Sequence, residues 1–354
     1  MTLALGARVN PTPESWEGER RSLLDKRISE LGLSVAGSMV ERLQEQLYRE
    51  LGAKGLAFKP PVYLSDQWGC PDGTPLIGVP FYLADPRLAR LEEETAVEVE
   101  TELEAIRYMR HEAGHAFNYA YRLYDRADWR RTFGPYSRPY QERYRVNPFS
   151  RDFVRHILGW YAQKHPDEDF AETFAVWLTP DGDWRRAYAG WPALRKLEYV
   201  DRVMGEVGGG VPEIPALTPD DLPVEEMHYT VAEHYQEADE EFPIEDEGHF
   251  DGDLRTIFGS PQDAPQGESA GAFIRRHRRE VVGRITYWTG ESATTVRKLV
   301  DFLAERANAL GLRVGGLEAS TLIELTAFAT AVMMNFRYTN AYEATPPRTD
   351  AGPP

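Results

Sequence analysis

Apolar positions recur at helical spacing over most of the chain. Residues 14–52 carry leucine, isoleucine and valine three and four positions apart, which predicts one or two amphipathic helices with a break near Gly32–Ser34. Residues 93–124 predict the strongest helix, because an acidic start suits a helix N-terminus and an apolar stripe follows. Residues 269–311 and 317–338 predict further helices, the last of them very apolar.

The pattern differs in the middle of the chain. Residues 56–84 alternate prolines and glycines with short apolar runs, which predicts short strands joined by turns. Residues 126–150, rich in Arg, Tyr and Pro, are expected to form a surface loop. Helices are expected at 151–163 and from Pro166 onward, where proline and an acidic first turn favour a helix start. The fold class predicted from these elements is α+β, mostly helical.

Charge and composition narrow the functional classes. The net charge of −17 over 354 residues disfavours nucleic acid as a partner, because phosphate would be repelled. We expect no membrane partner, since no continuous apolar run approaches the roughly 18 residues that span a bilayer. The first residues lack the basic start of a signal peptide. A single cysteine, Cys70, fits a reducing cytoplasm; zinc ligation by Cys70 is the alternative to a plain loop residue.

One predicted helix carries a metal-binding motif. Residues 111–115 read His-Glu-Ala-Gly-His, which is the HExxH pattern. Because His111 and His115 are four positions apart, their imidazoles lie on one helix face and can share one zinc ion. Glu112 projects at a neighbouring angle, from which it can act as general base on a zinc-bound water. The motif predicts a zinc hydrolase whose third ligand lies elsewhere in the chain.

The third ligand is expected on a second helix. The metzincin continuation requires Gly and His where this chain has Asn118 and Tyr121, which leaves the gluzincin arrangement with a distant glutamate. Glu168 and Glu172 are one helical turn apart; one can bind the metal while the other orients a ligand histidine. Tyr161, seven residues before Glu168, is a candidate hydrogen-bond donor to the developing oxyanion.

The segment around Glu168 resembles known proteases. Glu-Asp-Phe-Ala at 168–171 matches gluzincin families in which one residue and then Phe-Ala follow the ligand glutamate. The segment is also similar to that of anthrax lethal factor-like proteases and Pro-Pro endopeptidases. The segments HEAGHAFNYAYRLY and HPDEDFAETFAVWL resemble bacterial proteins described as zinc-binding metallopeptidases. This resemblance covers roughly residues 60–205.

This resemblance implies a zinc-dependent metallopeptidase with a zincin-like core, in which a small β-sheet accompanies the HExxH helix. The implied ligands of Zn²⁺ are His111, His115 and Glu168. Glu112 and Tyr161 would be catalytic, and Glu172 would either orient a ligand histidine or replace Glu168 as the ligand. The implied partner is a peptide or protein substrate.

Glycines and prolines after residue 207 mark a boundary in the chain. The expected organisation is N-terminal helices packing on the core at 1–55, the metallopeptidase core at 56–207, an acidic Pro/Gly-rich linker or flap at 208–253, a C-terminal helical region at 254–342 and a disordered tail at 343–354. A second hypothesis is a zinc-bearing regulatory protein with little or no peptidase activity, whose C-terminal helices bind a protein partner. A third is a latent peptidase whose cleft is covered by the acidic linker or the C-terminal region.

Overall fold

The structure, a computed structural model, describes residues 13–95, 99–140, 144, 146–215, 223–236, 248–260, 262 and 264–339. The chain divides into two compact units. Unit 1 comprises Met1–Arg126, Leu178–Pro180 and Asp201–Glu240; unit 2 comprises Ala127–Trp177, Asp181–Val200 and Glu241–Pro354. The predicted tail at 343–354, and residues 216–222 and 237–247 of the predicted linker, lie outside the described residues.

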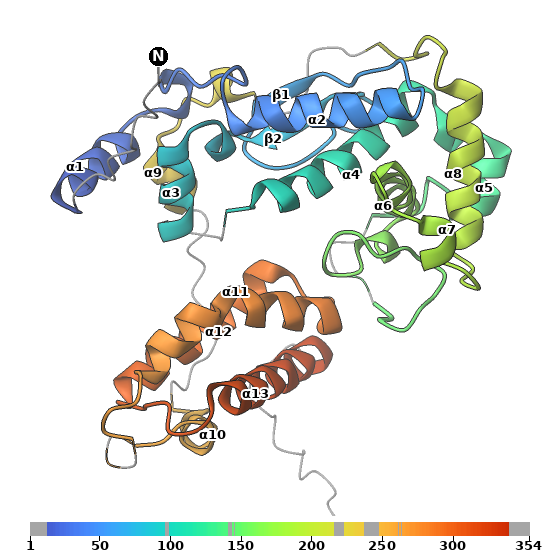
Figure 1. Ribbon diagram of the computed structural model, residues 1–354. Coiled ribbons are helices and arrows are strands. Elements are labelled where there is room, and N and C mark those ends of the chain that lie inside the picture. Colours follow the sequence, from blue (N-terminus) through green and yellow to red (C-terminus); the bar gives the residue numbers. More distant parts are fainter. Residues whose placement is uncertain are drawn as a thin grey trace, which may run out of the picture. The chain divides into compact units, whose positions relative to one another are not determined.

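Unit 1 combines helices with a small sheet (Figure 1). Its helices are α1 (Pro13–Leu24), α2 (Met39–Ala53), α3 (Pro86–Thr95), α4 (Glu102–Ala120) and α9 (Val231–Gln236), with 3₁₀ turns η1 (Ile28–Glu30), η2 (Phe81–Ala84), η3 (Leu123–Asp125) and η5 (Val224–Glu226). Strands β1 (Val62–Ser65) and β2 (Ile77–Pro80) pair in parallel, with Val62 opposite Ile77. The prediction of a mostly helical α+β protein with a small sheet is confirmed.

Helix α2 packs on α4, and α4 also contacts β2. Ser38 is the N-cap of α2: its side chain accepts a hydrogen bond from the backbone N–H of Val40 at 3.0 Å. The buried apolar residues of α2 recur three and four positions apart and form one face of the helix: Val40, Leu43, Leu47 and Leu51. All four residues of β2 are buried as well, so α4 packs on the apolar surfaces of both α2 and β2.

The single helix expected over 93–124 is two helices: α3 ends at Thr95 and α4 starts at Glu102. Helix α4 begins at Glu102 because Thr101 and Glu104 form a capping box. The Thr101 hydroxyl accepts from the N–H of Glu104 at 3.3 Å, and the Glu104 carboxylate accepts from the N–H of Thr101 at 2.9 Å. The boundaries of the prediction are therefore wrong, but residues 111–115 do lie within a helix, α4.

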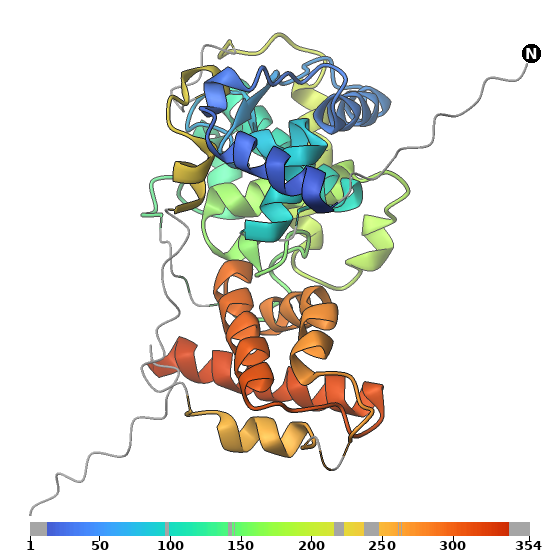
Figure 2. The ribbon, with the colours of Figure 1, turned by 90° about the vertical axis from the view of Figure 1, so that its left-hand side faces the viewer.

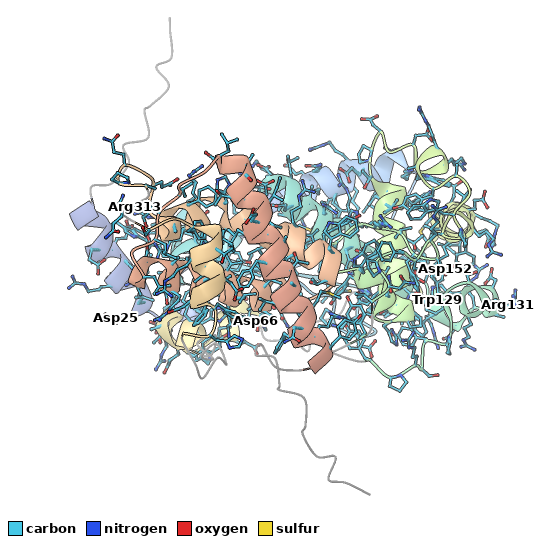
Figure 3. The ribbon with its side chains drawn as sticks, turned by 90° about the horizontal axis from the view of Figure 1, so that it is seen from below. Asp25, Asp66, Trp129, Arg131, Asp152 and Arg313 are labelled. Atoms are coloured by element: carbon cyan, nitrogen blue, oxygen red, sulfur yellow. The ribbon has the colours of Figure 1, made fainter. Side chains whose placement is uncertain are left out.

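Unit 2 is helical in the part of the chain that the structure describes. Its elements are α5 (Ala127–Phe133), η4 (Tyr161–Gln163), α6 (Pro166–Leu178), α7 (Trp184–Ala187), α8 (Leu194–Val207), α10 (Asp251–Ile257), α11 (Ala270–Thr289), α12 (Ala293–Ala309) and α13 (Glu318–Thr339). Helices α6 and α8 end in residues of unit 1. The segment 126–150, expected to be a surface loop, contains the helix α5. Trp129 (labelled in Figure 3) and Phe133 of α5 are buried and pack on Phe170, with distances of 6.2 and 5.4 Å between the ring centroids.

The helix expected at 151–163 is wrong. Residues 151–160 contain bends and turns, and only the short 3₁₀ turn η4 follows them. Gly159 and Trp160 have φ angles of 87° and 60°, in the left-handed region. Two consecutive residues of this kind cannot continue a right-handed helix, whatever the spacing of the apolar residues around them.

The C-terminal helices share a core of their own. Helices α11 and α12 pack along each other and α13 contacts both (Figure 2). By length and composition α13 is apolar enough to cross a membrane: the qualifying window has a mean hydropathy of 1.3 and is 28% buried. Polar residues such as Glu324, Thr326 and Thr330 interrupt its apolar positions, so it contains no long continuous apolar run. Helix α13 contributes Leu325, Ala329, Val332 and Met333 to the core of the C-terminal helices.

Candidate metal centre

Helix α4 brings the two motif histidines together. The Nε2 atoms of His111 and His115 are 3.1 Å apart, and the ring centroids are 4.8 Å apart. His111 is 2% exposed, and Glu112 and His115 are each 7% exposed. Burial of three such polar side chains is costly unless each has a partner, so their clustering on one helix points to a specific role.

A buried ion pair connects α4 to α2 immediately before the motif. Arg110 donates two hydrogen bonds to the Glu50 carboxylate, from Nε and Nη2, each at 2.7 Å. Parallel bonds of this kind fix the orientation of both side chains. Gln46 donates a further bond to Glu50 at 2.9 Å. The turn of α4 that carries His111 is thus tied to its neighbouring helix by charge as well as by apolar packing.

Helix α6 presents Glu168 from its first turn. Pro166 is the first helical residue, and three acids follow it, as predicted. His165 caps the helix: its Nδ1 accepts from the N–H of Asp167 at 3.2 Å. The Nε2 atom of His165 lies 2.8 Å from the carbonyl oxygen of Arg138, which can only accept, so Nε2 carries the proton. His165 is therefore structural in this arrangement.

The ligand atoms of His111, His115 and Glu168 all lie within 4.8 Å of one another, and all three residues are buried. Among the described residues, this is the group that could hold a metal ion. Zinc binds nitrogen at about 2.0–2.1 Å, so two tetrahedral ligand atoms are roughly 3.3 Å apart, close to the spacing of the two Nε2 atoms. Two imidazoles and one carboxylate also form a donor set known from catalytic zinc sites with an open fourth position. The residues fit the ion.

Glu172 is not a member of this group. Its side chain is fully buried, one turn further along α6, and its carboxylate accepts a hydrogen bond from the backbone N–H of Ile157 at 2.9 Å. Glu172 thus holds the irregular segment that precedes η4. Cys70, the alternative zinc ligand, donates from its thiol to the carbonyl oxygen of Thr74 at 3.3 Å and is likewise outside the group.

Tyr161 reaches Glu168 through a residue that the sequence analysis missed. The hydroxyl of Tyr140 donates to Oε1 of Glu168 at 2.6 Å, and the hydroxyl of Tyr161 lies 3.4 Å from that of Tyr140. Since Tyr140 directs its only proton to Glu168, Tyr161 is the donor to Tyr140. Burial, together with the Glu168 carboxylate, raises the pKa of Tyr140, which therefore stays protonated at neutral pH.

A lysine lies beside both tyrosines. The Nζ atom of Lys164 is 4.4 Å from the ring centroid of Tyr140 and 5.0 Å from that of Tyr161. Cation–π contacts of this kind favour one orientation of the two rings. Nothing in the spacing of Tyr140 or Lys164 along the chain marks them in advance, because they meet Glu168 and Tyr161 only in the folded unit.

A known protein family matches the part of the chain that carries the candidate metal centre. Residues 92–187 match the model of a family described as "Putative zinc-binding metallo-peptidase". This span contains both the HExxH motif on α4 and Glu168 on α6. No curated protein and no solved structure matches the chain. The matched span contains all three residues of the buried group that could hold a metal ion, and the family description names zinc as the metal.

Proposed function

We propose that the chain is a zinc-dependent peptidase of the gluzincin type, in which His111, His115 and Glu168 hold Zn²⁺ within a zincin-like core. The observation that carries the proposal is the buried group of three ligand atoms, two of them supplied by an HExxH helix. The family match supports it from the sequence side. Glu172 is assigned the task of holding the chain around Ile157 rather than binding the ion.

Zinc bound at this group would lower the pKa of a water molecule and polarise the scissile carbonyl. Glu112, between the two ligands on α4, takes the proton of the attacking water and delivers it to the leaving nitrogen. With substrate present, the Tyr161 hydroxyl would turn its proton away from Tyr140 and donate it in a hydrogen bond to the developing oxyanion. Tyr140 keeps the Glu168 carboxylate oriented by the 2.6 Å hydrogen bond it donates. The substrate class is a peptide or protein.

The test is zinc content and peptide hydrolysis in matched variants. We expect one zinc per chain in the wild type and in Glu112→Ala, because Glu112 is not a ligand. We expect hydrolysis to fall by about 10²–10⁴-fold in Glu112→Ala, since proton transfer is lost. Glu102→Ala is the control: it removes an exposed carboxylate from the same helix, paired with Arg42 at 3.2 Å, and should keep wild-type activity.

Full peptidase activity in Glu112→Ala would refute this mechanism. Stoichiometric zinc in a wild-type chain that cleaves none of a broad set of peptides would instead support a zinc-bearing regulatory protein. His111→Ala, expected to lose the zinc, shows whether any measured metal is bound at this site.

A further inference from the structure

Tyr161 follows a residue with an unfavourable backbone conformation. Trp160 has φ 60° and ψ 40°, in the left-handed region, which a bulky side chain rarely adopts. Such a conformation persists only where surrounding contacts stabilise it. Because η4 begins directly after Trp160, the contacts of Trp160 also set the direction in which Tyr161 leaves the turn.

The main contact of Trp160 comes from the end of α11. Its indole Nε1 donates to the carbonyl oxygen of Tyr287 at 2.6 Å, and the two ring centroids are 5.4 Å apart. Tyr287 is in the last turn of α11, where carbonyl groups have no partner within the helix. The indole therefore provides a helix-end carbonyl with its hydrogen bond, over a sequence separation of 127 residues.

Arg155 contacts both partners of this hydrogen bond, Trp160 and Tyr287. Its guanidinium carbon lies 4.3 Å from the centroid of the Trp160 ring. Its Nη1 donates to the hydroxyl of Tyr287 at 3.0 Å, and its Nη2 donates to the carbonyl oxygen of Pro148 at 3.2 Å. One side chain thus stacks on Trp160 and bonds to the residue of α11 that Trp160 contacts.

Residues 144 and 146, which precede the segment 155–160 in the chain, also contact α11 and α13. The hydroxyl of Tyr144 donates to the carbonyl oxygen of Gly159 at 2.7 Å, while Arg337 of α13 donates to the carbonyl oxygen of Tyr144. Gly290 ends α11 with φ 69°, and a Cβ placed there would lie 2.4 Å from the side chain of Val146. A larger residue could not occupy that position without moving the segment.

These contacts reach the candidate metal centre through η4. Gln163, the last residue of η4, accepts from the N–H of Asn147 at 2.8 Å and donates to its carbonyl oxygen at 2.9 Å. The hydroxyl of Tyr161, the first residue of η4, lies 3.4 Å from that of Tyr140, which is bonded to Glu168. Both ends of the turn therefore contact residues of unit 2 that lie 16 and 21 positions earlier in the chain.

We propose that Trp160 is a positioning residue: its hydrogen bond to the Tyr287 carbonyl, together with the bond that Arg155 donates to the Tyr287 hydroxyl, fixes the place of the Tyr161 hydroxyl beside Tyr140 and Glu168. The C-terminal helices α11–α13 are then part of the peptidase and not an appended module. This inference rests on the proposed function, in which Tyr161 donates to the oxyanion, and it assigns α11 a role in that step.

The experiment compares Trp160→Phe with Trp288→Phe in the full-length, zinc-loaded chain. Trp160→Phe keeps an aromatic ring and removes the donor. Trp288→Phe is the same chemical change on α11, at a residue that is 49% exposed. In Trp160→Phe we expect a kcat about 10–100-fold lower, KM within about threefold and unchanged zinc content, because misplacing a catalytic group slows chemistry more than binding. Trp288→Phe should match the wild type.

Amide hydrogen exchange provides a readout that does not depend on activity. We expect residues 157–164 to exchange about tenfold faster in zinc-loaded Trp160→Phe than in the wild type, with α4 unchanged. If wild-type chains hydrolyse no peptide, the proposed function fails and the exchange rates alone test the Trp160–Tyr287 contact. Wild-type kcat in an active Trp160→Phe, or wild-type exchange at 157–164, overturns the inference.

Tyr287→Phe covers the case in which Trp160→Phe does not fold. It leaves the Tyr287 carbonyl in place and removes only the hydroxyl that accepts from Arg155. We expect smaller changes in the same direction, in both kcat and the exchange of residues 157–164. If Tyr287→Phe equals the wild type in both measurements, Arg155 and Tyr287 do not position this turn and the inference is overturned.

Discussion

The buried ion pair between Glu50 and Arg110 offers a quantitative test of how α4 is held. In Glu50→Leu, the Arg110 guanidinium, whose side chain is 8% exposed, loses both of its 2.7 Å hydrogen bonds to the carboxylate. Little water reaches the charge to compensate for the loss. Removing one partner of such a pair costs about 3–5 kcal/mol, a factor of roughly 10²–10⁴ in the folding equilibrium.

The double variant Glu50→Leu with Arg110→Met separates charge burial from packing. Replacing both ions with apolar residues of similar size is commonly neutral or stabilising, so we expect the double variant to lie within about 1 kcal/mol of the wild type or above it. Arg42→Met is the control on α2. Arg42 pairs with Glu102 at 3.2 Å, but these side chains are 57% and 50% exposed, so its loss should cost less than about 1 kcal/mol.

The assay is native-state amide hydrogen exchange of α2 and α4, which reports the opening free energy of these helices within a chain of two units. Zinc content should stay stoichiometric in folded protein, because Arg110 bonds to α2 and not to the ligands. A loss below about 1 kcal/mol in Glu50→Leu would refute the reasoning, since it would mean that Arg110 finds water or another partner without cost.

Two further predictions concern α6. The Nζ atom of Lys196 lies 2.6 Å from the buried Asp169 carboxylate. Lys196→Met leaves that carboxylate without its cation and should lower the free energy of unfolding, measured with denaturant, by about 3 kcal/mol. Adding Asp169→Asn removes the buried charge and should restore most of this loss. Destabilisation that Asp169→Asn does not relieve would contradict the charge argument. Tyr140→Phe should weaken zinc binding by about tenfold in competition with a chelator, since Glu168 loses an orienting hydrogen bond. Tyr338→Phe, at a residue that is 72% exposed, is the control, and equal affinities in the two variants would contradict the assignment.

Features that lie within one helix could be predicted from the sequence, because the spacing of two residues along a helix decides whether their side chains lie on the same face. The pairing of His111 with His115 follows from four positions on one helix, and α6 begins at Pro166 because proline and the acids after it favour a first turn. The small sheet was likewise visible in the turn-rich stretch at 56–84. The helix expected at 151–163 failed because its apolar spacing is helical while Gly159 and Trp160 take left-handed backbone angles.

By itself the sequence was enough to predict two candidate ligands, a candidate general base and zinc as the metal, since these predictions depend on residue type and local spacing. Tertiary structure decided which carboxylate joins the histidines. Glu168 and Glu172 are equivalent candidates along the helix, and Glu168 is the one whose ligand atom lies within 4.8 Å of those of the histidines. Tyr140 and Trp160 became visible for the same reason: their partners, Glu168 and Tyr287, lie 28 and 127 residues away along the chain.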